Sequence, residues 1–267
     1  MKGNIDLHVH SSRSHDGCGA VRDWCRRAVE RGLRVIGFAE HVDLDVTDAV
    51  FDPLDFDAYR VEVLAARAEF AGRLEVRLGV EVGYMPGIET EIAAWLADRP
   101  VDYVIGSVHT IFENAGVSAE YDALETFARH EFWEIYEEYF ESVAAMVRSG
   151  LFDIAGHFDL VHRFGVQYLQ CEMEWGRLYG TVTRAFEGVI LRQMALEINT
   201  SGLRQAPRSC YPDRKLLQLY AELGGRAVTL GSDAHFPDDL GAGLDEAMAL
   251  VRRFNLQPID FINRQPV

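Results

Sequence analysis

The sequence predicts an α/β fold in one domain spanning residues 1–267, and three observations support this prediction. Short apolar runs alternate with segments of helical periodicity along the whole chain, which is typical of parallel strands joined by helical crossovers. No repeat with a period of roughly 20–50 residues and no low-complexity linker divides the chain. The length of 267 residues suits one large core. We therefore expect a distorted, TIM-like (β/α)7 barrel.

The expected strands are the short apolar runs. They cover residues 4–9, 34–39, 76–82, 102–108, 153–156, 195–200 and 227–231. Seven strands rather than eight is the reason to expect a distorted barrel. The stretch 258–262 is a candidate for one further strand.

The expected helices lie between these strands, at residues 20–31, 57–71, 88–98, 124–149, 174–193, 213–223 and 243–253. In the first of them, Val21, Trp24 and Ala28 recur at helical spacing, and Gly32 stands where a C-terminal cap belongs. The run 124–149 carries apolar residues on one side throughout and stops at Gly150, so we expect one long helix there.

The formal net charge of −16 argues against binding long nucleic acids, whose phosphate backbone requires a basic surface. A small phosphorylated substrate remains compatible with this charge, because bound divalent cations reverse the charge locally. No apolar run reaches the roughly 18 residues that span a membrane, and the first five residues do not resemble a signal peptide. The sequence gives no indication of oligomeric state.

The four cysteines show no C-x-x-C spacing. We interpret Cys18, Cys25, Cys171 and Cys210 as reduced residues that pack in the interior, which predicts a cytoplasmic protein.

Histidines and carboxylates follow the predicted strands at their C-terminal ends. The first strand ends in His8-Val9-His10, whose two imidazoles share one face because side chains alternate along a strand. Similar residues end the later strands: Glu40-His41, Glu81, His109, His157, Asn199, and Asp233 with His235. Strand ends of this kind meet at one mouth of a β/α barrel. His15 lies just beyond the first strand, and we expect His130, inside a helix, to be structural.

So many ligands exceed what one metal ion requires, since a single catalytic zinc takes about three protein ligands and a water. A bridging carboxylate allows two cations to share a hydroxide and to bind a phosphoryl oxygen. Nitrogen and oxygen donors without thiolate suit zinc, manganese or ferrous iron. Glu81 follows the apolar run Leu78-Gly79-Val80, where a charge needs a partner, so a metal-ligand role is the better interpretation. A closed structural site would not need this many ligands at the mouth.

The motifs, in their order, resemble the polymerase-and-histidinol-phosphatase superfamily over essentially the whole chain. They are H-x-H at residues 8–10, E-H at 40–41, G-x-E at 79–81, S-x-H at 107–109, G-H at 156–157 and S-D-A-H at 232–235. The stretches 79–82, 102–109 and 197–204, with the long helix 124–149, are similar to the histidinol-phosphate phosphatases within it.

This resemblance implies a distorted seven-stranded barrel and a site for three divalent metals, zinc, manganese or iron. The first metal would take His8, His10, Glu81 and Asp233; the second Glu81, His109 and His157; the third His15, His41 and His235. Asp16 is an alternative to His15 as a ligand.

The resemblance also implies hydrolysis of L-histidinol phosphate in histidine biosynthesis, through a metal-activated hydroxide that attacks phosphorus in line. Glu81, Asp233 and Arg204 would be catalytic, with Arg204 and Arg163 binding phosphate. Asp43 and His162 either contact the amine and imidazole of the substrate or only solvate a loop. The alternative substrate class is a nucleotide or oligonucleotide, and the rival from another class is a non-catalytic barrel braced by metals.

Overall fold

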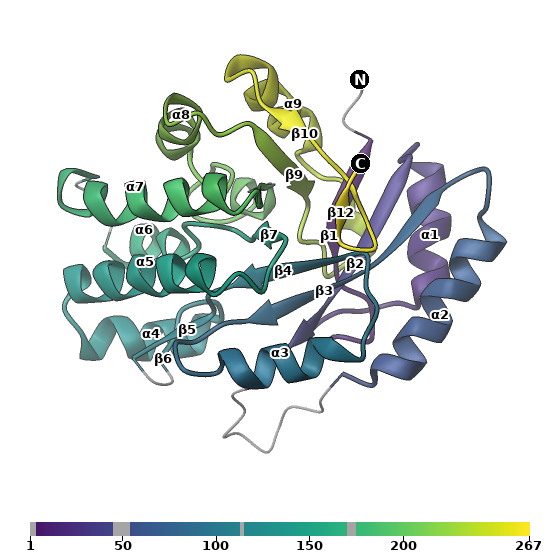
Figure 1. The fold of residues 1–267 in the computed structure, drawn as a ribbon, viewed down its shortest axis with the longest axis horizontal. Helices are drawn as coiled ribbons and strands as arrows, with labels where there is room; N and C mark the ends of the chain where they lie inside the picture. The colour runs from purple at the N-terminus through teal and green to yellow at the C-terminus, as the bar shows by residue number, and fades with distance from the viewer. Residues whose placement is uncertain (1–3, 45–53, 113–114, 170–174) are drawn as a thin grey trace.

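Eight parallel strands form one curled sheet at the centre of the molecule (Figure 1). The computed structural model describes residues 4–44, 54–112, 115–169 and 175–267. In sheet order the strands are β1 (Ile5–Val9), β2 (Val35–Val42), β3 (Glu75–Gly83), β4 (Tyr103–Ser107), β7 (Ile154–Ala155), β8 (Ala195–Asn199), β9 (Ala227–Gly231) and β10 (Gln257–Pro258). All seven expected strands are present. The candidate stretch 258–262 contributes only Pro258 to β10, the eighth strand of the sheet, and its Phe261–Ile262 part forms β11 in a separate hairpin.

Helices surround the sheet, as expected for crossovers between parallel strands (Figure 1). They are α1 (Val21–Glu30), α2 (Phe56–Glu69), α3 (Glu89–Ala97), α4 (Glu120–Arg129), α5 (Phe132–Ser149), α6 (His162–Leu169), α7 (Trp175–Leu191), α8 (Arg214–Glu222) and α9 (Leu244–Arg253), with 3₁₀ turns at Ser201–Leu203 and Pro237–Asp239. Two small hairpins pair β5 (Thr110–Ile111) with β6 (Ala115–Gly116), and β11 (Phe261–Ile262) with β12 (Gln265–Pro266). In the part of the chain that the structure describes, no helix combines the length and apolar character that crossing a membrane requires.

The predicted single helix over residues 124–149 is wrong, because α4 and α5 are separate helices. His130 has extended backbone angles (φ −123°, ψ 149°), and Glu131 begins α5 with a reciprocal capping box that it forms with Glu134. Apolar periodicity continues across the break, so the pattern alone hides it. The short helix α6 was also not predicted.

The barrel is distorted because its first and last long strands meet at one point only. Val9 of β1 and Ala234, beyond β9, form an isolated parallel bridge. Next to it, the buried carboxylate of Asp6 accepts hydrogen bonds from Ser232 N (2.9 Å), Ser232 Oγ (2.5 Å) and Gly241 N (2.9 Å). These contacts hold the segment that carries Asp233 against the end of β1.

A separate apolar cluster fills the inside of the barrel, and Tyr103 is its largest member. Its hydroxyl donates to the carbonyls of Leu7 (2.7 Å) and Phe38 (3.1 Å), so the buried polar group is satisfied. A Cβ atom on Gly79 would lie 2.3 Å from the Tyr103 ring. Glycine in β3 is therefore what makes room for this ring.

The C-terminal hairpin closes the N-terminal mouth of the barrel. Phe261 is buried in the interior cluster, whereas its neighbour Ile262 is 39% exposed. Arg264 binds Asp153, at the start of β7, with Nε–Oδ2 at 2.8 Å, and Asp260 binds Arg77 of β3 with Oδ2–Nη2 at 2.7 Å.

We expect Phe261→Ala to lower the free energy of unfolding by about 3–5 kcal/mol, because it removes a fully buried aromatic ring and leaves a cavity. Ile262→Ala is the matched control in the same strand, and it should change stability by less than about 1 kcal/mol. Urea denaturation of both variants measures the difference. Equal losses would show that the hairpin does not seal the barrel.

Candidate metal centre

The residues at the C-terminal strand ends gather in one place. His8 and His10 come from the end of β1, His41 and Glu81 lie near the ends of β2 and β3, and the other side chains follow β4, β7 and β9. His8, His10, Glu81 and His157 are almost completely buried. A buried cluster of this kind needs a compensating partner for each polar atom.

Glu81 is at the centre of this cluster. Its Oε1 atom lies 2.8 Å from His157 Nε2 and 3.3 Å from His109 Nε2. Its Oε2 atom lies 3.0 Å from His41 Nδ1, 3.3 Å from His8 Nε2 and 3.5 Å from His10 Nε2. One carboxylate therefore faces five histidines.

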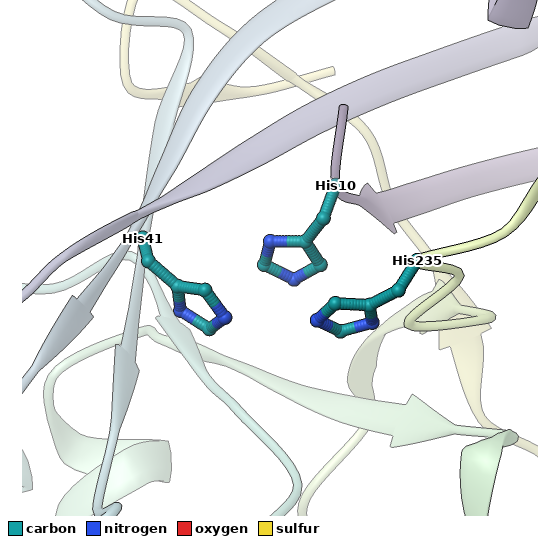
Figure 2. Close-up of side chains that lie close together, drawn as sticks. All are labelled: His10, His41 and His235. Carbon is teal, nitrogen blue, oxygen red and sulfur yellow. The ribbon is translucent and has the colours of Figure 1, made fainter. Parts of the chain in front are cut away.

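Among the residues that the structure describes, three groups of side chains place their donor atoms close enough to bind a metal ion together. They are His8, His10 and Asp233; Glu81, His109 and His157; and His10, His41 and His235. Figure 2 shows the rings of the last group turned toward one point from three different segments. His10 belongs to two groups, and its ring stacks on His41 at 4.3 Å and on His235 at 4.2 Å between centroids.

His15 lies at the edge of these groups. Its side chain is 41% exposed, and its ring centroid lies 5.4 Å from that of His41. Asp16 is nearer to the third group, with 3.1 Å from Oδ2 to His235 Nε2 and 3.5 Å from Oδ1 to His41 Nε2. Asp16 therefore contacts the third group directly, and the choice between Asp16 and His15 as a metal ligand stays a prediction.

Buried atoms without hydrogen bonds mark where a cation fits. His8 Nε2, His10 Nε2 and His41 Nδ1 have no hydrogen-bond partner, yet each lies between 3.0 and 3.8 Å from a carboxylate oxygen of Glu81 or Asp233. Imidazole nitrogens and carboxylate oxygens without thiolate suit zinc, manganese or iron. The residues present therefore fit divalent metal ions.

Electrostatics within the cluster keeps its carboxylates charged. Burial works against charge on Glu81 and Asp233, but His8 and the other neighbouring histidines hold the pKa of each carboxyl well below its usual range. For His10, burial and then the charges of His41 and His235 lower the pKa to about 3, so this ring is neutral and able to donate a lone pair. Asp233 has a left-handed backbone (φ 52°), an uncommon conformation that asparagine and aspartate tolerate best.

A cavity of about 530 Å³ opens above the cluster. Histidines and carboxylates of the cluster form its floor, and Leu44, Met85, Ile88 and Leu160 add apolar wall. Arg163 is the only arginine among the described residues that line it, and Nη1 of Arg163 donates to Ser118 O at 3.1 Å. Asp43 also lines the cavity, with Oδ1 3.9 Å from His109 Nδ1.

Two residues predicted to contact substrate lie outside the cavity lining. Arg204 donates through Nη2 to Ser232 O at 2.8 Å, its Nε lies 3.4 Å from Asp239 Oδ1, and its buried Nη1 has no hydrogen bond. His162 Nδ1 lies 3.2 Å from the Tyr136 hydroxyl. Their roles toward phosphate and substrate stay predictions.

Sequence reasoning missed the residues that support the ligands. Glu197 receives a hydrogen bond from His8 Nδ1 at 2.6 Å, and Ser107 Oγ donates to Glu81 Oε1 at 2.6 Å. Ser14 Oγ links His10 Nδ1 (3.2 Å) to the buried carboxylate of Glu40 (2.6 Å). Glu197 and Asn199 are two residues apart in β8, so their side chains lie on the same face of the strand. This spacing was a signal in the sequence for a second inward-facing polar group.

Comparison with known proteins places these features in a family. The profile of the PHP domain matches residues 6–201. A protein of Deinococcus radiodurans named probable histidinol-phosphatase is 32% identical over 280 residues, covering 99% of both chains. The histidinol-phosphatase of Lactococcus lactis subsp. lactis is 28% identical, covering 93% of this chain and 90% of the relative.

A solved structure shares the fold over the full length. The crystal structure of histidinol phosphate phosphatase from Lactococcus lactis subsp. lactis, complexed with zinc, L-histidinol and phosphate, superposes with a TM-score of 0.87 at 23% identity and covers all of both chains. This likeness confirms the predicted distorted TIM-like barrel.

Proposed function

The chain belongs to the PHP domain family, and from that membership we propose that it is a metal-dependent phosphomonoesterase that hydrolyses L-histidinol phosphate to L-histidinol and phosphate in histidine biosynthesis. The observation that carries the proposal is the convergence of histidines on Glu81 beneath an open cavity. The names of relatives that match along nearly the whole chain support the choice of substrate.

The ligand groups suggest how metals would be held. His8, His10, Glu81 and Asp233 would hold one ion, Glu81, His109 and His157 a second, and His41 and His235, with His10, His15 or Asp16, a third. We propose three divalent ions, zinc, manganese or iron; zinc is present in the Lactococcus lactis structure. When bound, such ions activate a water molecule and neutralise charge on phosphoryl oxygens.

The remaining residues would bind and orient the substrate. Arg163 on the cavity wall has a planar fork of donors that matches phosphate oxygens. Arg204, with its unpartnered Nη1 atom beside the Asp233 segment, is the second candidate for a phosphate contact. Asp43, which also lines the cavity, would contact the substrate amine, and His162, which lies outside the lining beside Arg163 in α6, is a candidate for a contact with the imidazole.

We further propose that residues 1–267 act as one metallophosphatase domain in the cytoplasm. Cys18, Cys25 and Cys210 have free thiols, which suits a reducing compartment; Cys171 lies outside the described residues. The −16 net charge supports a small substrate over a nucleic acid.

A substrate panel tests the assignment. We expect the highest kcat/KM on L-histidinol phosphate, compared with nucleoside monophosphates, a 3′,5′-bisphosphate and a short single strand, because Asp43 and Asp122 line the cavity beyond the metal ligands and favour a substrate with a positively charged amine. A preference of more than tenfold for a nucleotide would instead make the enzyme a nucleotide phosphoesterase of the same family.

A further inference from the structure

We propose that Glu197 is a positioning residue that fixes which nitrogen of His8 faces the metal, and that the same carboxylate secures ligands of a second metal. The inference rests on the proposed function only in requiring that metal binds at the candidate centre. Glu197 lies inside the barrel on β8 and is 1% exposed.

Both oxygens of Glu197 are used as hydrogen-bond acceptors. Oε1 accepts from His8 Nδ1 at 2.6 Å, the shortest distance that a histidine makes in the cluster. Oε2 accepts from the backbone N–H of His157 at 2.8 Å and from Asn199 Nδ2 at 3.1 Å. Three donors therefore converge on one buried carboxylate.

The contact with Oε1 selects the tautomer of His8. A neutral imidazole has one N–H donor and one lone-pair nitrogen, and a carboxylate can only accept. With its hydrogen on Nδ1, His8 presents the lone pair of Nε2, which is buried without a hydrogen bond and lies 3.3 Å from Glu81 Oε2 and 3.8 Å from Asp233 Oδ1. Only this tautomer can bind a cation on that side.

The contacts with Oε2 extend the effect to other ligands. The N–H of His157 is fixed directly, and His157 belongs to the group with Glu81 and His109. Asn199 Nδ2 also lies 3.3 Å from Asp233 Oδ2. The Asn199 amide is itself oriented, because its Oδ1 accepts from the N–H and hydroxyl of Ser201 at 3.0 and 2.6 Å. Glu197 therefore supports a ligand in each of two groups, His8 in the group with His10 and Asp233, and His157 in the group with Glu81 and His109.

Gly231, the last residue of β9, leaves room for the contact between Glu197 and His8. A Cβ atom on Gly231 would lie 2.3 Å from Glu197 Oε1 and 2.5 Å from His8 Cβ. Any side chain there would displace the carboxylate from the ring. The neighbouring strand therefore leaves space for the Glu197–His8 pair.

Glu197→Gln tests the proposal, because an amide has one acceptor oxygen and one NH₂ donor. If the oxygen serves His157 and Asn199, the NH₂ group faces His8 Nδ1, which must then accept; the hydrogen moves to Nε2, where it blocks the metal. We expect a 10–100-fold weaker zinc affinity by chelator competition, at least one zinc ion fewer per chain after dialysis, and unchanged unfolding of the metal-free protein.

Asp159→Asn is the matched control. Asp159 is a fully buried carboxyl whose Oδ2 accepts from Asp213 N at 3.0 Å, a bond that an amide oxygen preserves. This variant should retain zinc at the wild-type level. Wild-type zinc affinity in Glu197→Gln, or equal zinc loss in both variants, would overturn the proposal.

A measurement on the unaltered protein keeps the proposal testable if Glu197→Gln does not fold. Histidine ¹⁵N NMR of the zinc-loaded protein should show His8 with a slowly exchanging Nδ1–H and metal on Nε2; metal on Nδ1 would overturn the proposal.

The proposed function and the positioning role of Glu197 can fail separately. If Glu197→Gln loses zinc but the unaltered protein does not hydrolyse histidinol phosphate, only the proposed function is refuted. If the unaltered protein hydrolyses histidinol phosphate but Glu197→Gln retains zinc, only the positioning role is refuted.

Discussion

Glu81→Ala and Asp233→Ala are each expected to abolish phosphatase turnover, with at least a roughly 10³-fold loss in kcat, while the chain stays folded. Glu81 faces five histidines and is shared by the proposed first and second metal groups, so its loss removes an anionic ligand from both. Losing several kcal/mol of charge stabilisation in the transition state corresponds to this factor.

Steady-state assays on histidinol phosphate, with metal analysis and circular dichroism on the same preparations, measure the result. Glu187→Ala is the control, because Glu187 is an exposed carboxylate of α7, and it should retain full activity. Full activity in both Glu81→Ala and Asp233→Ala would refute the proposal that these ligands support catalysis, and with it the enzymatic interpretation of the cluster.

Metal content is expected to fall from near three ions per chain at pH 7.5 toward two at pH 5.5. Metal binds neutral imidazole, so protons compete with it as the pH falls. The group formed by His10, His41 and His235 should empty first: it contains no carboxylate, and the nearby Asp16 is 43% exposed and screened by solvent. Elemental analysis after dialysis measures the stoichiometry, and His235→Ala should remove the difference between the two pH values.

The stability of the metal-free protein should have the opposite pH dependence: it should fall as the pH rises. Burial opposes charge on His109, but Glu81 and then Asp43 raise the pKa of this ring to about 9; His41 is raised in the same direction, chiefly by Glu81. A histidine whose pKa is higher in the folded than in the unfolded chain adds to the free energy of unfolding. This contribution is complete below the unfolded pKa of about 6.5 and is lost as the pH rises through about 9.

Thermal unfolding with and without zinc therefore separates the two effects. The increase in Tm caused by zinc should be larger at pH 8.5 than at pH 5.5, where about two ions per chain remain bound. A zinc-dependent increase that is larger at pH 5.5, or loss of metal from the Glu81–His109–His157 group before the three-histidine group, would contradict the ligand assignment.

The strands and the mouth of the barrel could be predicted because both depend on local patterns. Apolar runs mark β1 to β4 and β7 to β9, and a parallel fold brings their C-terminal ends together whatever the details of packing. His8, Glu81 and Asp233 were accessible to this reasoning for the same reason.

Contacts between distant segments could not be predicted in this way. The approach of Asp16 to His235 depends on how the loop after β1 folds back. The contact of Glu197 with His8 depends on the closure of the barrel, which brings β9 against β1 and β8 close behind it. The break between α4 and α5 is set by the capping box of Glu131 and Glu134, which competes with a continuous apolar stripe. Side-chain direction at Arg204 is likewise decided by Ser232 and Asp239.

The seal formed by Phe261 has a consequence for the order of events during synthesis. Phe261 is synthesised long after Leu7 and Tyr103, yet it completes the interior cluster around them. A nascent chain that does not yet include Phe261 must leave this surface partly open, although every proposed metal ligand has already been made. Strands exposed in this way are prone to aggregation, so synthesis of the segment that carries Phe261, rather than assembly of the site, is the step at which the interior cluster becomes complete.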